Sequence, residues 1–158
     1  MLTIGQNVYR AIVAHARAEH PIAACGLVAG RIGSDRPTRF VPVANTRRSA
    51  DFWEFDPVEQ FKAWREMDRR GEEPVIIYHS NPFAEAYPSR TDVRYFAYPD
   101  AHFVVLSGQD ATGPGTSAAR FRSFRITDGT ITEESVVIEP EDARPAAVEP
   151  EDANPTRF

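Results

Sequence analysis

The sequence predicts one α/β (α+β) domain, in which a mixed sheet is flanked by helices, followed by a disordered acidic tail. Short apolar runs bounded by Gly or Pro alternate with amphipathic segments, a pattern typical of strands interleaved with helices. Two alternating segments also surround Asp128-Gly129, a strong signal for a β-hairpin. The chain has 158 residues, of which 42% are hydrophobic, so it can bury one core. We therefore expect the domain to span residues 1–138 and the tail to span residues 139–158.

Three segments are predicted to be helical. Apolar side chains recur at helical spacing in residues 5–19, which we expect to form a helix that ends before Pro21. A second helix is expected to begin at Asp56, a good N-cap residue followed by Pro, and to end at Gly71. A third helix is expected over about residues 89–97.

The strands are predicted from short apolar or alternating runs. Pro42 cannot donate to a sheet ladder, so its strand is expected at a sheet edge or at a bulge. Residues 108–118 are rich in Gly, Thr, Ser and Pro and are expected to form a flexible loop. The expected strands are 24–31, 39–45, 74–79, 102–107, 121–127 and 130–138, with a short extended piece at 52–55.

The charge of the chain is concentrated in the tail. Residues 139–158 hold six acids and two Arg, so they supply −4 of the net charge of −5. The remaining domain has no basic field, which argues against nucleic acid or an anionic membrane as a partner. The imperfect repeat EPEDARP and EPEDANP is rich in Pro and acid, which favours disorder. The tail is interpreted as a solvating segment, with a docking peptide for a partner as the alternative.

The chain is expected to be cytoplasmic. It has a single cysteine, Cys25, which excludes an internal disulfide and fits a reducing compartment. The N-terminal segment lacks the pattern of a signal peptide, and no stretch approaches the roughly 20 apolar residues that span a bilayer.

The segment YHSNPFAEAYPSRTD, residues 78–92, contains the residues most suited to chemistry. A buried strand ends at His79, and Ser89 and Asp92 begin the third predicted helix. A catalytic zinc site uses about three protein ligands and leaves one position for water. Residues two apart on a strand face the same way, so a His-x-His pair can bind one ion. Here Asn81 occupies the second position of such a pair.

This segment resembles the motif of the JAMM (MPN) metallopeptidases, which is His-x-His, seven residues, Ser, two residues and Asp. His79, Ser89 and Asp92 are in register with that motif, and the resemblance extends over roughly residues 1–138. It implies a single MPN/JAMM-like domain, with a zinc ion held by His79 and Asp92 and by Asn81 in place of the second His. It also implies Ser89 as the catalytic residue that steadies the oxyanion. Small bacterial members cut next to the C-terminal diglycine of ubiquitin-like sulfur-carrier proteins, so such a carrier or its C-terminal tail is the partner that the resemblance implies.

Two departures from the family pattern affect the chemistry. Ala23 stands where the family has the glutamate that activates the zinc-bound water, and Asn81 replaces a metal ligand. An amide oxygen is a poor zinc ligand beside imidazole. We therefore expect altered or lost peptidase activity. Three alternatives remain: different chemistry with a harder ion such as iron or manganese, a metal-free pseudoenzyme that binds a partner, and residual zinc-dependent hydrolysis.

Several residues near the motif have a structural explanation as well as a chemical one. Ser89 and Asp92 also fit a helix capping box, and His79 fits a half-buried, hydrogen-bonded histidine. Cys25 could offer a thiolate, but a small buried cysteine is more often packing. Glu85 could reach the site from its loop, although loop carboxylates are usually solvated. The remaining histidines are expected at the surface or at helix ends rather than as ligands: His15, His20 and His102.

Overall fold

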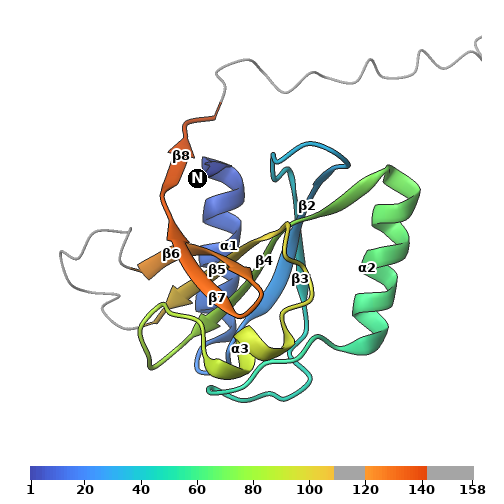
Figure 1. The fold of residues 1–158 in the computed structure, drawn as a ribbon. Helices are drawn as coiled ribbons and strands as arrows, with labels where there is room; N and C mark the ends of the chain where they lie inside the picture. Colours follow the sequence, from blue (N-terminus) through green and yellow to red (C-terminus); the bar gives the residue numbers. More distant parts are fainter. Residues whose placement is uncertain (109–119, 142–158) are drawn as a thin grey trace, which may run out of the picture.

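The structure, a computed structural model, describes residues 1–108 and 120–141, and its main feature is a mixed six-stranded sheet (Figure 1). The strand order is β3-β2-β4-β5-β6-β7, and only β4 and β5 run parallel among these neighbours. The helices are α1 Gln6–Glu19, α2 Pro57–Arg70 and α3 Arg90–Tyr95. The strands are β1 Leu2–Gly5, β2 Cys25–Arg31, β3 Arg39–Val43, β4 Glu72–Asn81, β5 His102–Ser107, β6 Phe121–Thr127, β7 Thr130–Glu134 and β8 Val136–Glu139.

Helices cover both faces of the six-stranded sheet, which confirms the predicted architecture. Successive side chains on a strand point to opposite faces, and β4 shows this clearly. Ile77 packs in the core cluster that contains Met67 of α2 and is bordered by Val93 of α3. Ile76 packs instead in the cluster that contains Ile12 of α1. The two faces of β4 therefore contact different helices, and each face has its own core.

The local signals for the second helix are confirmed. The side chain of Asp56 accepts hydrogen bonds from the backbone N–H groups of Val58 and Glu59, both at 3.0 Å, and caps the helix as expected. Gly71 ends α2 with a φ of 67°, in the left-handed region that glycine adopts without strain. Strand β3, which contains Pro42, lies at an edge of the sheet, as predicted.

The prediction was wrong at the two ends of the domain. It omitted β1, and it treated residues 130–138 as one strand. The structure divides that segment at Ser135: β7 forms the expected hairpin with β6, whereas β8 pairs in parallel with β1 in a separate two-stranded sheet. Leu2 and Ile4 of β1 are fully buried, which explains why this short strand is held. Residue 139, the first of the predicted tail, is the last residue of β8.

Two predicted segments fall largely outside the described residues. The predicted loop at 108–118 is described only at Gly108, and the predicted tail only through Glu141. Among the helices that the structure describes, none is long and apolar enough to cross a membrane.

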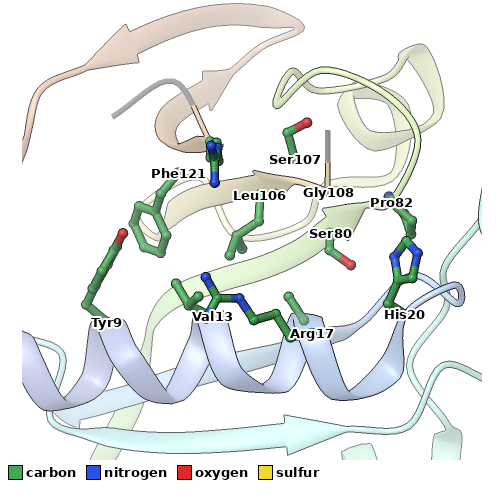
Figure 2. A pocket seen from close by; sticks show the side chains of 12 residues that line it. Tyr9, Val13, Arg17, His20, Ser80, Pro82, Leu106, Ser107, Gly108 and Phe121 are labelled. Carbon is green, nitrogen blue, oxygen red and sulfur yellow. The ribbon is translucent and has the colours of Figure 1, made fainter. Parts of the chain in front are cut away.

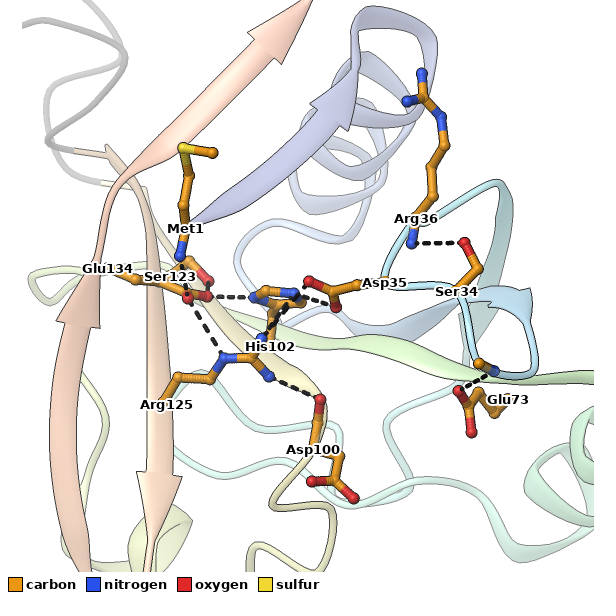
Figure 3. A network of polar contacts seen from close by, with 11 residues as sticks. Met1, Ser34, Asp35, Arg36, Glu73, Asp100, His102, Ser123, Arg125 and Glu134 are labelled. Carbon is orange, nitrogen blue, oxygen red and sulfur yellow. Dashed lines mark hydrogen bonds and ion pairs between the residues drawn. The ribbon is translucent and has the colours of Figure 1, made fainter.

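A buried polar network ties β5 to β7 and to the loop that precedes β3 (Figure 3). Its centre is His102, which was expected at the surface but is fully buried. His102 Nε2 lies 2.7 Å from Asp35 Oδ1, and His102 Nδ1 contacts Glu134 Oε1. Ser123 donates a hydrogen bond of 2.7 Å to the same Glu134 oxygen. His102 is buried because its imidazole is held between two carboxylates, which is how a buried polar group avoids a large desolvation cost.

The carboxylate of Glu134 is strongly stabilised in its charged form. Burial alone would raise its pKa, but hydrogen bonds from His102 and Ser123 outweigh burial and lower the pKa of Glu134 to about 2, from 4.5. Because the folded pKa is the lower one, this group stabilises the fold above about pH 4.5. That contribution is lost as the pH falls from about 4.5 towards 2.

Replacing Glu134 by Gln is expected to lower the free energy of unfolding at pH 7 by about 2 kcal/mol, because buried donors lose a charged acceptor. Urea denaturation measures this. Glu133→Gln is the matched control: the Glu133 side chain is 47% exposed and pairs with Arg122 at the surface, where such pairs contribute about 0–1 kcal/mol. Between pH 4.5 and 2 the Glu134→Gln variant is expected to lose less stability than the native protein. Equal losses in the two variants at pH 7 would contradict this role.

Candidate functional site

The structure brings His79 and Asp92 together, as the motif predicts. His79 lies near the end of β4 and Asp92 in the first turn of α3, and both are buried. The distance from His79 Nε2 to Asp92 Oδ2 is 3.0 Å, so the imidazole donates a hydrogen bond to the carboxylate. The two residues expected to share a metal ion therefore contact each other directly.

Trp53, in the segment that precedes α2, contacts both residues of this pair. Its indole Nε1 donates a hydrogen bond of 2.9 Å to Asp92 Oδ1. The indole also stacks on the imidazole of His79, with ring centroids 5.1 Å apart and an interplanar angle of 18°. Both oxygens of Asp92 thus have hydrogen-bond partners, and one face of His79 is covered by an aromatic ring.

Ser89 is the N-cap of α3, which confirms the capping box. The backbone N–H of Ser89 donates to Asp92 Oδ2 at 2.8 Å, and Ser89 Oγ accepts from the backbone N–H of Asp92 at 3.1 Å. Burial alone would raise the pKa of Asp92. The hydrogen bond and charge of His79, with the hydrogen bonds from Ser89 and Trp53, hold it below its usual value of 3.8.

Asn81 makes two hydrogen bonds that its place in the motif does not imply. Its side-chain amide nitrogen donates to the carbonyl oxygen of Glu85 at 2.9 Å and to that of Tyr87 at 3.3 Å. These two bonds tie the end of β4 to the loop that leads to α3. In this arrangement Asn81 orders the loop, and its amide nitrogen is engaged away from the His79–Asp92 pair.

The other residues considered from the sequence do not supply the missing chemistry. Ala23 is buried, and its methyl group can neither move a proton nor bind a metal. Cys25 is fully buried, its Sγ donates to the carbonyl of Val43 at 3.4 Å, and burial raises its pKa to about 12. Its thiol is therefore protonated and inert. Glu85 contributes its backbone carbonyl to Asn81 and is not among the described residues that line the cleft beside Asp92.

A cleft with a volume of about 590 Å³ opens beside the pair. It runs from Ser89 and Asp92 to the segment before α2 and to the end of α3. Two aromatic side chains on its rim are exposed, Phe52 at 59% and Tyr95 at 70%. The lining also includes Arg47, Asp51, Trp53, Glu54, Phe55, Pro57, Gln60, Ile77, Thr91, Phe96, Ala97 and Tyr98. An apolar cleft with a few polar groups is the usual form of a ligand site.

These residues do not fit the zinc ion that the family resemblance implies. In residues 1–108 and 120–141, no three His, Cys, Asp or Glu side chains are placed to hold a metal ion. His79 and Asp92 supply two ligands, whereas a catalytic zinc site needs about three. The site therefore has too few ligand side chains to hold a catalytic zinc ion.

Sequence reasoning missed Trp53. The segment DFWEF was expected only as a short extended piece, and in the structure it contributes an isolated bridge between Asn45 and Phe55. Trp53 reaches Asp92 across 39 positions of sequence. The signal that could have found it is the density of aromatic residues in a polar loop, because buried indole N–H groups usually have a partner.

Replacing Trp53 by Phe is expected to lower the free energy of unfolding by about 1.5–3 kcal/mol, because Asp92 loses a hydrogen bond to a charged oxygen while an aromatic ring is kept. The matched control is Trp64→Phe on α2, since Trp64 packs against Phe55 and Tyr98 rather than against Asp92. Loss of this bond also raises the pKa of Asp92, so acid unfolding of the Trp53 variant is expected to begin at a higher pH. Denaturant titrations over a pH series test both points. A cost no larger than that of Trp64→Phe would exclude the bond as a significant contribution.

Known proteins with similar sequences include two hydrolases. Over 136 residues the chain is 48% identical to the CysO-cysteine peptidase of Mycobacterium tuberculosis, covering 86% of this chain and 90% of that protein. It is 27% identical over 111 residues to the desampylase of Haloferax volcanii, covering 67% of this chain and 80% of that protein. Among solved structures, one protein of Desulfitobacterium hafniense superposes with a TM-score of 0.75 at 29% identity, covering 89% of this chain and 94% of that one.

A family model describing prokaryotic homologues of the JAB domain matches residues 5–127. These residues include the three helices that the structure describes and five strands of the six-stranded sheet. They also include the whole segment that resembles the JAMM motif. On this match, and on its identity to the mycobacterial peptidase, the chain belongs to the JAB (MPN) domain family.

Proposed function

We propose that this protein binds the C-terminal tail of a ubiquitin-like sulfur-carrier protein in the cleft beside Asp92, and that it lacks the zinc-dependent peptidase activity of its relatives. The observation that carries the proposal is the set of groups at the site: among the described residues no three His, Cys, Asp or Glu side chains are placed to hold a metal ion, and the buried residue at the position of the family's glutamate is Ala23.

Two missing groups support loss of hydrolysis. A positioned general base contributes about 10² to 10⁴ in rate, and Ala23 offers none. A second imidazole would be needed to bring the ligand set to three, and the amide nitrogen of Asn81 is bonded instead to two loop carbonyls. Among the described residues, no specific contact favours altered chemistry with iron or manganese, or residual zinc hydrolysis, over this interpretation.

The partner class is supported by the relatives and by the cleft. The chain is 48% identical to a protein named for its action on CysO-cysteine, and the match covers 90% of that protein. The cleft keeps a volume of about 590 Å³ and an exposed aromatic rim formed by Phe52 and Tyr95. Exposed aromatic side chains are enriched where proteins bind partners. We infer that binding is retained after catalysis is lost.

The first test measures binding and cleavage with the native chain. The probe is a ubiquitin-like sulfur-carrier protein with an amino acid amide-linked to its C-terminus. We expect saturable binding by calorimetry and no release of the amino acid, with or without added zinc. Phe52→Glu is expected to weaken binding by about tenfold or more, as at an interface hot spot. The control Phe83→Glu alters a 58% exposed aromatic residue that does not line the cleft and should bind normally. Cleavage by the native protein that a chelator abolishes would overturn the proposal.

The second test restores the two missing groups. The double variant Ala23→Glu with Asn81→His is expected to bind about one zinc ion per chain and to release the amino acid from the same probe. Asn81→His alone is expected to bind zinc but to react about 10² to 10⁴ times more slowly than the double variant, because it lacks the base. Metal analysis and a timed cleavage assay measure these outcomes. A double variant that folds but binds no zinc would show that the motif has been placed incorrectly.

A further inference from the structure

A second cavity lies on the α1 face of the sheet, opposite the face that carries the His79–Asp92 pair. It has a volume of about 430 Å³ and is bounded by α1 and by the adjacent ends of β4, β5 and β6 (Figure 2). We call it the α1 groove. It is lined by Tyr9, Val13, Ala16, Arg17, His20, Ser80, Pro82, Leu106, Ser107, Gly108, Arg120 and Phe121.

The α1 groove combines an apolar floor with a cationic edge. Leu106 and Phe121 are buried at its floor, and Val13 borders it from α1. Figure 2 shows the side chain of Arg17 lying over the groove from α1. Arg120 adds a second guanidinium, and no Asp or Glu is among the described lining residues. An occupant that matches this surface has a short apolar centre with negative charges beside it.

We propose that the acidic C-terminal segment of the same chain, residues 142–158, binds in the α1 groove. Its sequence has the complementary pattern: the small apolar residues Ala146-Ala147-Val148 stand between two acidic clusters, around residues 141–142 and 149–152. The apolar centre matches the floor, and the acids at 149–152 match Arg17 and Arg120. Charge complementarity of this kind selects and orients a partner.

The described end of the chain is placed to deliver this segment. Glu141 Oε1 accepts a hydrogen bond of 2.8 Å from the backbone N–H of Asn7, so the chain leaves the domain at the start of α1 (Figure 1). The six residues from Glu141 to Ala147 reach at most about 20 Å when extended. Along α1, Ala16 lies nine residues beyond Asn7, a rise of about 14 Å. The apolar centre of the segment can therefore reach the middle of the groove.

Binding within one chain also has an entropic advantage. A tethered segment acts at an effective concentration in the millimolar range, so weak contacts suffice to occupy the groove. A second copy of the chain or a separate anionic ligand would lack this advantage. The tether at Glu141 thus favours the chain's own segment as the occupant.

The test uses the full chain with a nitroxide spin label attached through Asn154→Cys. In the folded protein the label attaches to the introduced cysteine and not to Cys25, because Cys25 is fully buried and burial raises its pKa to about 12. We expect amide signals of α1 groove residues such as Ala16 to lose intensity in ¹⁵N spectra, while signals of Ala63 on α2 do not. Arg17→Glu should restore the intensity, whereas the same charge change at the exposed Lys62 of α2 should not. Salt at about 1 M, where the screening length is about 3 Å, should weaken the effect.

Variants in the segment test the proposal without altering the folded domain. Val148→Asp should restore groove intensities because a charge cannot enter the apolar floor, and Val148→Ile should leave the loss in place. Unchanged groove signals in the labelled native chain would overturn the proposal. An equal intensity loss in ¹⁵N chains that carry no spin label, when they are mixed with spin-labelled chains lacking ¹⁵N, would overturn it in favour of binding between copies.

Discussion

The hydrogen bond between His79 and Asp92 is the constraint that fixes the geometry of the candidate site. Burying an unpaired carboxylate is costly, and burying a paired one is tolerable only when its oxygens are satisfied. Here His79, Trp53 and Ser89 satisfy Asp92 together. The same bonds that make this burial tolerable also use the atoms that a metal ion would need. With two ligands, a cation would have to displace this network and would gain too few protein contacts in return.

The topology explains why these residues meet. In open α/β sheets, ligands bind beyond the carboxyl ends of parallel strands, and β4 and β5 are the only parallel neighbours in the six-stranded sheet. The connection between them passes through α3, so the end of β4 and the start of α3 lie at the same edge. The capping box then fixes Asp92 relative to the backbone of Ser89. A local folding signal and a position of the motif therefore coincide in one side chain, since the capping box needs Asp92 whatever its chemical role.

Local signals explain what could be predicted from the sequence. The helix caps, the buried strands and the hairpin follow from patterns within a few residues, whereas the approach of His79 to Asp92 was expected from the resemblance to the JAMM motif. The parallel pairing of β1 with β8 joins opposite ends of the domain, and no local pattern reveals it. Trp53 and the imidazole of His102 were misjudged for the same reason, since each is explained by partners more than 30 positions away. Asn81 was interpreted only as a substituted metal ligand, and its bonds to two loop carbonyls could not be predicted because they depend on how the loop folds.

Strand β4 separates two surfaces that can change independently. His79 belongs to the face covered by α2 and α3, whereas the next residue, Ser80, lines the α1 groove. Because neighbouring side chains on a strand point to opposite faces, substitutions at positions 79 and 81 alter the catalytic face without entering the groove. The core cluster on the α1 face shares no residue with the cluster on the other face. Substitutions at the candidate site on one face of the sheet can therefore leave a binding surface on the other face unchanged.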